Sequence, residues 1–186
     1  LIRVDSEQAR RLLIQLSNFF RANLQGARTN LIPLMKELTQ VEAYRSLEQA
    51  RFPDRYQVDI AVEEGMEEVL LPPFLIQILL ENAFKHAFGS RKTDNRVWID
   101  VRSSPDGVFI SVRDNGEGID TKRLEKLGKE AVPSLEGTGS ALDNLNKRLT
   151  SLFGESAKLH FVSSPTGTTV HCTVPYQDRQ GRVCGY

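Results

Sequence analysis

The sequence predicts an α+β fold: a two-layer α/β sandwich in which a mixed, mostly antiparallel sheet lies under helices on one face, with additional helices at the N-terminal end. Three observations support this expectation. Segments with apolar residues at helical spacing open the chain, an almost entirely apolar helix follows, and several later stretches alternate apolar and polar residues as strands do. Turns that contain Pro and Gly separate some of these stretches, which favours hairpins.

Two amphipathic helices are expected before the first strand. Asp5 or Ser6 can cap the first helix, which extends to about Leu24 before Gly26 ends it. The second helix has Pro33 near its start. Their apolar faces consist of Ala9, Leu12, Leu13, Leu16, Phe19 and Phe20, and of Leu34, Leu38, Val41, Tyr44 and Leu47. The two helices could form a separate layer or pack on the α/β core, and the sequence leaves both arrangements open.

The expected strands are residues 55–62, 96–103, 108–114, 158–163 and 168–174. Two turns, Ser104–Gly107 and Ser164–Gly167, join neighbouring strands, because Pro presets φ and Gly accepts a positive φ. A short helix is expected from Asp120 to about Leu127. Residues 128–136 lack strong periodicity and form either a mobile lid or a bare surface loop, and Tyr176–Tyr186 is a polar tail.

The most apolar helix of the chain ends in a cluster of polar residues. Pro72-Pro73 suit its start, since the first turn of a helix does not use its amide protons. The polar residues at its end are Glu81, Asn82, Lys85 and His86. Their spacing of three and four residues lets an amide oxygen, a carboxylate and an ammonium converge, which suits a hydrated Mg²⁺ and a polyphosphate. The alternative is an ordinary helix C-terminus, where Lys and His interact favourably with the helix dipole.

A second polar group follows the strand at residues 108–114. Gly116 and Gly118 allow positive φ and close backbone approach, and Asp114 opens the turn. A buried Asp in such a turn can accept a hydrogen bond from an exocyclic amine such as N6 of adenine. On its own, this stretch could equally be a simple loop turn.

A third stretch, residues 136–142, contains Gly137 and Gly139 and leads into an amphipathic helix that ends near Phe153. Bare amides at the N-terminus of that helix favour phosphate. The alternative is that Thr138 or Ser140 is merely a helix cap.

The order and spacing of these three stretches resemble a known family. ENAFKHA at residues 81–87 is similar to the N-box, DNGEG at 114–118 to the G1 box, and EGTGSALDNLNKRL at 136–149 to the G2 box of GHKL ATPases. That family includes gyrase-type, Hsp90-type and MutL-type ATPases and histidine kinases. ARFPDR at residues 50–55 resembles the segment that precedes the ATPase domain in LytS-type sensor histidine kinases. The resemblance extends to about Pro175 and implies the Bergerat (GHKL) fold.

The resemblance implies a role for each matching residue. Asn82 is the expected Mg²⁺ ligand, Lys85 contacts phosphate, and Glu81 either polarises an incoming imidazole or only orients solvent. The residues expected around the base are His86, Asp114, Gly116, Gly118 and Thr168, with Asp114 bound to the adenine amine. The residues expected at the phosphate end of the lid are Gly137, Thr138 and Gly139. Two positions depart from the family pattern: Ser140-Ala141 replaces a more usual Gly or Leu pattern, and Gln77 stands where some relatives have Asn or His.

The expected function is that of the ATP-binding catalytic domain of a two-component sensor histidine kinase, with ATP and Mg²⁺ as cofactors. Residues 1–52 would be the rear part of a dimerisation and phosphotransfer region, 53–176 the catalytic domain and 177–186 a tail. The chain begins without Met, so an excised fragment is expected, with the acceptor histidine upstream of Leu1. Such a fragment binds ATP-Mg²⁺ and does not phosphorylate itself.

Composition and charge limit the kinds of partner that we expect for this chain. The formal net charge is +0 with both signs mixed, so no nucleic-acid partner is expected. No apolar run reaches the ~18–20 residues of a membrane span, so the fragment should not contact a membrane directly. Cys172 and Cys184 could be reduced thiols of a cytosolic protein. The resemblance implies a response-regulator partner, a homodimer at full length, and a cytoplasmic position in a membrane sensor protein.

Two other functions remain open. One is another GHKL enzyme, either a serine kinase of the anti-sigma type or a chaperone-like ATPase. The other is a nucleotide-sensing or dimerisation module without catalysis.

Overall fold

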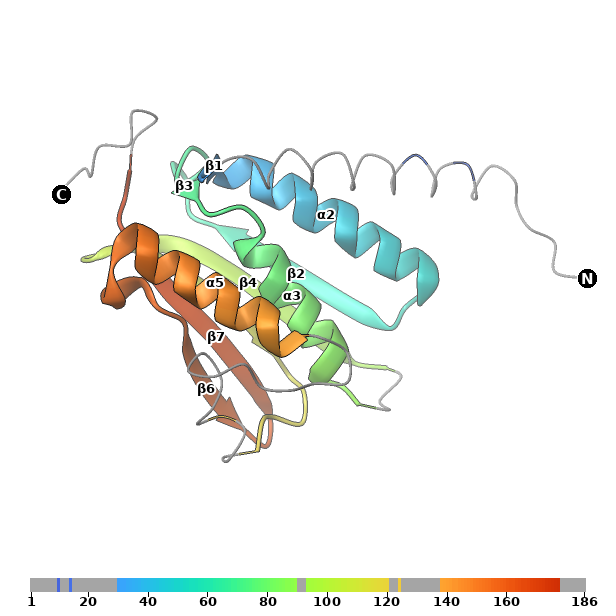
Figure 1. Cartoon of the computed structure of the whole chain (residues 1–186). Helices are drawn as coiled ribbons and strands as arrows, with labels where there is room; N and C mark the ends of the chain where they lie inside the picture. Colours follow the sequence, from blue (N-terminus) through green and yellow to red (C-terminus); the bar gives the residue numbers. More distant parts are fainter. Residues whose placement is uncertain are drawn as a thin grey trace, which may run out of the picture.

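The computed structural model describes residues 30–89, 93–120 and 138–177, together with Arg10, Ile14 and Leu124. The predicted first helix, the short helix after Asp120, the stretch 128–136 and the C-terminal tail lie wholly or mostly outside the described residues. The elements that position the site are all described (Figure 1). They are β1 (Ile32–Pro33), α2 (Leu34–Arg51), β2 (Tyr56–Val62), β3 (Leu70–Leu71), α3 (Leu75–His86), β4 (Asn95–Ser104), β5 (Gly107–Asp114), α5 (Thr138–Phe153), the 3-10 helix η1 (Glu155–Ala157), β6 (His160–Ser164) and β7 (Gly167–Val174).

The main sheet has five strands in the order β2-β4-β5-β7-β6. Strands β2 and β4 are parallel, and the other neighbouring pairs are antiparallel. A parallel pair needs a crossover connection, and α3 lies in the connection between β2 and β4. The predicted mixed, mostly antiparallel sheet is therefore confirmed. Strand β6 begins at His160 rather than at the predicted Lys158: η1 ends at Ala157, and Lys158 and Leu159 connect it to the strand.

Helices α2, α3 and α5 cover one face of the sheet (Figure 1). Because the helices cover one face, every second residue along a strand is buried. Val97, Ile99 and Val101 of β4 face the helices and are at most 1% exposed. Helix α2 shares this core, since Leu34 and Val41 have no exposed surface. The second predicted helix therefore packs on the α/β layer, one of the two arrangements that the sequence left open.

The start of α2 is tied to the start of α3 by a small ribbon that sequence reasoning missed. Strand β1 pairs with β3 in an antiparallel two-stranded sheet, with Ile32 opposite Leu71. Pro72-Pro73 follow β3 and precede α3, which begins at Leu75. The prediction that the prolines lie in the first turn of this helix was therefore wrong: they connect β3 to the helix. Among the described residues, no helix combines the length and apolar character that a membrane crossing requires.

Candidate nucleotide-binding site

The C-terminal end of α3 is bonded directly to the turn that follows β5. The backbone N–H of Glu117 donates to the carbonyl of Ala87 at 2.9 Å. The contact is close because Gly116 has no side chain: a Cβ there would lie 2.1 Å from the Ala87 carbonyl oxygen. The glycine predicted to approach a ligand therefore also approaches the end of the helix that bears Asn82 and Lys85. The first two polar stretches of the sequence thus meet in the fold.

Asp114 is the last residue of β5 and is 8% exposed. Its Oδ1 accepts hydrogen bonds from the backbone N–H of Gly116 at 2.8 Å and of Thr168 at 3.1 Å. Gly167 permits this arrangement, since a Cβ there would lie 2.0 Å from the Asp114 carbonyl oxygen. The carboxylate is therefore held in one orientation by the turn after β5 and by the start of β7. A carboxylate offers about four acceptor positions and can accept donors besides these two backbone groups.

Ser163 is a site residue that sequence reasoning missed. Its Oγ accepts the backbone N–H of Ile119 at 2.7 Å and lies 3.1 Å from Oγ1 of Thr168. Gly118 has a φ of +76°, and a Cβ there would lie 2.0 Å from the Ser164 carbonyl oxygen. The turn after β5 is thus held against the β6–β7 hairpin. The sequence contained no signal for this role, because a serine in a predicted strand is an ordinary surface residue.

The polar side chains at the end of α3 are partly organised in advance. Nζ of Lys85 lies 3.3 Å from Oε2 of Glu81, and Nε2 of Gln77 donates to Oε1 of Glu81 at 2.9 Å. Nδ2 of Asn82 donates to the carbonyl of Ile78 at 2.7 Å, which turns the amide oxygen away from that carbonyl. His86 is the last residue of α3 and is exposed. The predicted convergence of Glu81 and Lys85 is present, and the side chain of Asn82 is fixed by its own helix.

The ARFPDR stretch and the residue that follows it, Tyr56, hold the same end of α3. The hydroxyl of Tyr56 donates to the carbonyl of Phe84 at 3.4 Å, and the rings of the two residues stack with centroids 4.2 Å apart. The guanidinium of Arg55 donates to the carbonyl of Gly89 at 3.4 Å and lies over the rings of Phe52 and Tyr56. These contacts fix the backbone at the end of α3, around Phe84 and Gly89, and so help to hold the polar side chains that lie there.

Helix α5 begins with Thr138 and Gly139, while Gly137 lies outside the described residues. Near the other end of α5, the guanidinium of Arg148 donates to the carbonyl of Pro73, just before α3. At 1.5 Å per residue, Thr138 lies roughly 15 Å along the helix from Arg148. Helices α3 and α5 run in opposite directions in Figure 1, so the start of α5 lies toward the end of α3 that bears Asn82.

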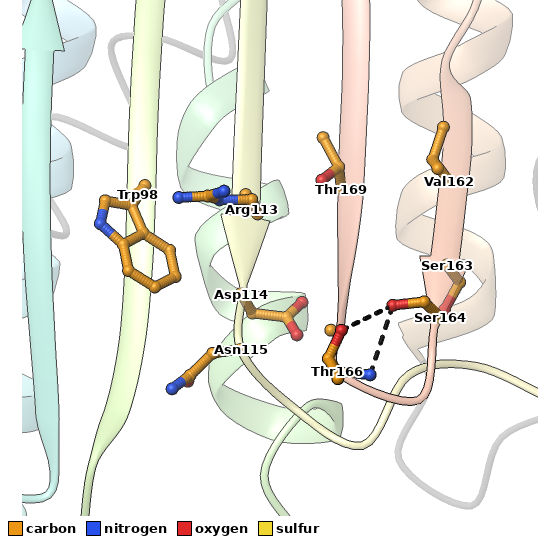
Figure 2. A pocket seen from close by; sticks show the side chains of 10 residues that line it. Trp98, Arg113, Asp114, Asn115, Val162, Ser163, Ser164, Thr166 and Thr169 are labelled. Carbon is orange, nitrogen blue, oxygen red and sulfur yellow. Dashed lines mark hydrogen bonds between the residues drawn. The ribbon is translucent and has the colours of Figure 1, made fainter.

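A groove of about 250 Å³ lies beside Asp114 on the opposite face of the sheet (Figure 2). Its walls include Trp98, Arg113 and Thr169, which point away from the helices, and the Arg113 guanidinium lies 4.2 Å from the centroid of the Trp98 ring. Neither Asn82 nor Lys85 lines this groove. This groove is therefore not the cavity that we expect between Asn82 and Asp114. That cavity stays a prediction.

The donor set fits Mg²⁺ bound together with a polyphosphate. Within residues 30–89, 93–120 and 138–177, no three His, Cys, Asp or Glu side chains are grouped as a metal cage would require. Mg²⁺ commonly takes only one or two protein oxygens and completes its octahedron with phosphate and water. The amide oxygen of Asn82 is a ligand of this kind.

Comparisons with known proteins show which family the chain belongs to. Residues 73–178 match the family described as histidine kinase-, DNA gyrase B- and HSP90-like ATPases, and residues 1–56 match a family described as histidine kinase. The sensor protein LytS of Staphylococcus epidermidis is 55% identical over 95% of this chain, and that of S. saprophyticus is 56% identical over 96%. The sensor histidine kinase/phosphatase LytS of S. aureus is 53% identical over 97%. The chain spans 30–31% of the length of these relatives.

Solved structures show the same fold. A histidine kinase domain from the Erythrobacter litoralis EL346 blue-light activated histidine kinase superposes with a TM-score of 0.60 at 20% identity, covering 91% of this chain and 80% of that one. The catalytic domain of histidine kinase ThkA gives a TM-score of 0.62 at 16% identity and covers 78% of this chain and 94% of that one. From the matched residues and the fold together, the chain belongs to the family of histidine kinase-, DNA gyrase B- and HSP90-like ATPases, and over nearly its whole length it is similar in sequence to the LytS sensor proteins.

Proposed function

We propose that this chain is the ATP-binding catalytic region of a sensor histidine kinase, which binds ATP with Mg²⁺ between the end of α3, the turn after β5 and the start of α5. The observation that supports it best is the fixed carboxylate of Asp114, held by the N–H groups of Gly116 and Thr168 beside the end of α3. A buried, oriented acceptor of this kind selects a ligand that offers an exocyclic amine, as adenine does.

Each side chain then has a defined task. Asp114 binds the adenine amine, with Thr168 and His86 beside the base and Gly116 and Gly118 shaping the turn. Asn82 would supply an oxygen ligand to Mg²⁺, which neutralises charge on the β- and γ-phosphates. Lys85 contacts phosphate, and Thr138 and Gly139 present backbone amides at the start of α5, while a role for Gly137 at the phosphate end stays a prediction. Positioning and charge neutralisation supply most of the catalysis of phosphoryl transfer.

The transfer step needs the imidazole of a histidine as nucleophile. That histidine lies outside this region, which aligns ATP with it. The imidazole nitrogen forms a bond to the γ-phosphorus, the bond to the bridging oxygen breaks, and ADP leaves with that electron pair. Glu81 would polarise the imidazole, and the contacts of its carboxylate with Gln77 and Lys85 support this role. In the full-length protein we expect a homodimer, a cytoplasmic position for this region, and a response regulator that receives the phosphoryl group.

Calorimetric titration tests the nucleotide assignment. ATP is expected to bind with micromolar-range affinity in the presence of Mg²⁺ and more weakly without it, and GTP is expected to bind far more weakly. The reason is that guanine presents a carbonyl where adenine presents the amine, and two acceptors would then face each other. ADP serves as the control for the γ-phosphate. Equal affinities for ATP and GTP would remove the role of Asp114.

Incubation with γ-labelled ATP tests where the acceptor lies. The chain has 3 histidines: His86 lies at the nucleotide site, and His160 and His171 lie opposite each other on β6 and β7. These two point to the face of the sheet away from the helices, because Cys172 faces the core. We therefore expect no acid-labile label on residues 1–186 alone, with a histidine outside them as the acceptor. Acid-labile label on residues 1–186 alone would show instead that the acceptor histidine lies within them.

A further inference from the structure

The N-terminus of α3 is capped by a carboxylate from another helix. Glu37 of α2 has no exposed surface. Its Oε2 accepts the backbone N–H of Phe74 at 2.8 Å, and its Oε1 accepts those of Ile76 at 3.0 Å and Gln77 at 3.2 Å. Three of the amides that a helix start leaves without intrahelical partners are therefore satisfied by one side chain. The positive end of the helix dipole also favours a carboxylate there.

Helix α3 does not cap itself. Its N-cap residue, Phe74, makes no side-chain capping hydrogen bond and has a φ of 67°, in the left-handed region. A bulky non-glycine residue in that region is strained, and such strain persists only where the surroundings impose it. The imposed geometry here comes from Glu37, which binds the Phe74 N–H, and from Arg148, which donates to the carbonyl of Pro73.

Keeping a carboxylate at this position costs stability. Burial raises the pKa of Glu37 from 4.5 to about 7, although the N–H groups of Gln77, Phe74 and Ile76 and the charge of Arg148 act in the opposite direction. Because the folded-state pKa lies above the unfolded-state value, ionisation of Glu37 opposes folding at neutral pH. That cost is relieved as the pH falls from about 7 toward 4.5. A buried acid retained at such a cost suggests a positional role rather than a stabilising one.

A line of hydrogen bonds runs from Glu37 along α3 to the phosphate end of the site. Glu37 accepts the backbone N–H of Gln77, the side chain of Gln77 donates to Glu81, and Glu81 pairs with Lys85. These three residues of α3 are spaced by four, so they lie on one face of the helix. Any change in the axial position or rotation of the helix start is therefore transmitted to Glu81 and Lys85.

Glu37 also joins two separately matched regions of the chain. It lies within residues 1–56, which match the histidine kinase family, whereas α3 and α5 lie within residues 73–178, which match the ATPase family. Arg148 of α5 donates to the carbonyl of Pro73, next to the residue that Glu37 caps, and its charge acts on Glu37. One buried carboxylate thus holds the catalytic helices to the helix that enters from the preceding region.

We propose that Glu37 is a positioning residue for phosphoryl transfer: it sets the position of α3 relative to α2 and α5, and through Gln77 it aligns Glu81 and Lys85 with the phosphates of ATP. Movement of α2 is then coupled to the phosphate end of the site, while the adenine end, which is built on β5 and β7, stays in place. This inference rests on the proposed function.

The experiment compares two ligands in the same variants. Mg²⁺-ATP reports on both ends of the site, and adenosine reports on the adenine end alone; calorimetry measures the first and an NMR titration the second. Glu37→Gln places an amide N–H₂ among backbone N–H donors and is expected to lower the Mg²⁺-ATP affinity about tenfold, an effect of the size found for residues coupled within one hydrogen-bond network. The adenosine affinity should be unchanged. Equal loss for both ligands, as partial unfolding would produce, overturns the proposal.

Two further variants make the test decisive. Gln77→Leu removes the bond to Glu81 and leaves the backbone cap, so a selective loss of Mg²⁺-ATP affinity is expected even if Glu37→Gln does not fold; no selective loss overturns the proposal. Gln40→Leu is the matched control on α2, since the side chain of Gln40 is 3% exposed and has no hydrogen-bond partner within the described part of the chain. It should preserve both affinities, and a selective loss there would also overturn the proposal. A wild-type chain that binds neither ligand refutes the proposed function instead.

Discussion

Substituting Asp114→Asn is expected to weaken ATP binding about 100-fold or more and to abolish the preference for ATP over GTP. In the variant, the amide oxygen can still accept the N–H groups of Gly116 and Thr168, so the turn keeps its bonds. The amide nitrogen would then face the adenine amine, donor against donor. Loss of a hydrogen bond to a charged group together with a buried unsatisfied donor costs about 3 kcal/mol, which corresponds to this factor.

Thermal unfolding of the same variant separates recognition from folding. Asp114→Asn should change the free energy of unfolding by only about 1 kcal/mol, since neutral hydrogen bonds replace charge-assisted ones. Asp114→Ala is the matched comparison: it leaves two buried N–H groups without an acceptor, each worth about 1–3 kcal/mol, and should destabilise the fold clearly. A stable Asp114→Asn variant that keeps its adenine preference would show that another group recognises the base.

Gly116→Ala is expected to lower the free energy of unfolding by about 3 kcal/mol and to remove ATP binding. The new methyl group would lie 2.1 Å from the Ala87 carbonyl oxygen, well inside contact distance, and backbone on both sides must move to admit it. The Glu117–Ala87 hydrogen bond that joins the turn to the end of α3 would break. Denaturant unfolding and ATP titration measure the two effects.

Gly65→Ala is the control for the loss of a glycine as such. Gly65 has a φ of +89°, and no atom lies within 4 Å of the position that a Cβ would take, so only its backbone conformation opposes the substitution. The cost there should be about 1 kcal/mol, with ATP affinity intact. Similar destabilisation in both variants, with ATP binding retained in Gly116→Ala, would show that the Gly116–Ala87 contact does not shape the site.

The strands and most helices follow from local patterns. Alternation of apolar residues located β2, β4, β5 and β7 to within a few residues, because one face of each strand packs under helices and the other does not. The apolar run before Glu81 located α3, because this helix is buried on most of its surface. The ribbon of β1 and β3 was missed, since two residues per strand contain no periodicity.

For the site, the sequence by itself determined which chemical groups are available: a carboxylate at the end of β5, an amide, carboxylate and ammonium at the end of α3, and glycines between them. Only the tertiary structure decided how they are held. Ser163 acts on a partner 44 residues away in sequence, Glu37 on partners 37, 39 and 40 residues away, and Arg148 on a partner 75 residues away. Hydrogen bonds over such distances depend on how the helices pack on one another and how the turn after β5 packs on the β6–β7 hairpin, and that packing leaves no mark in the spacing of neighbouring residues.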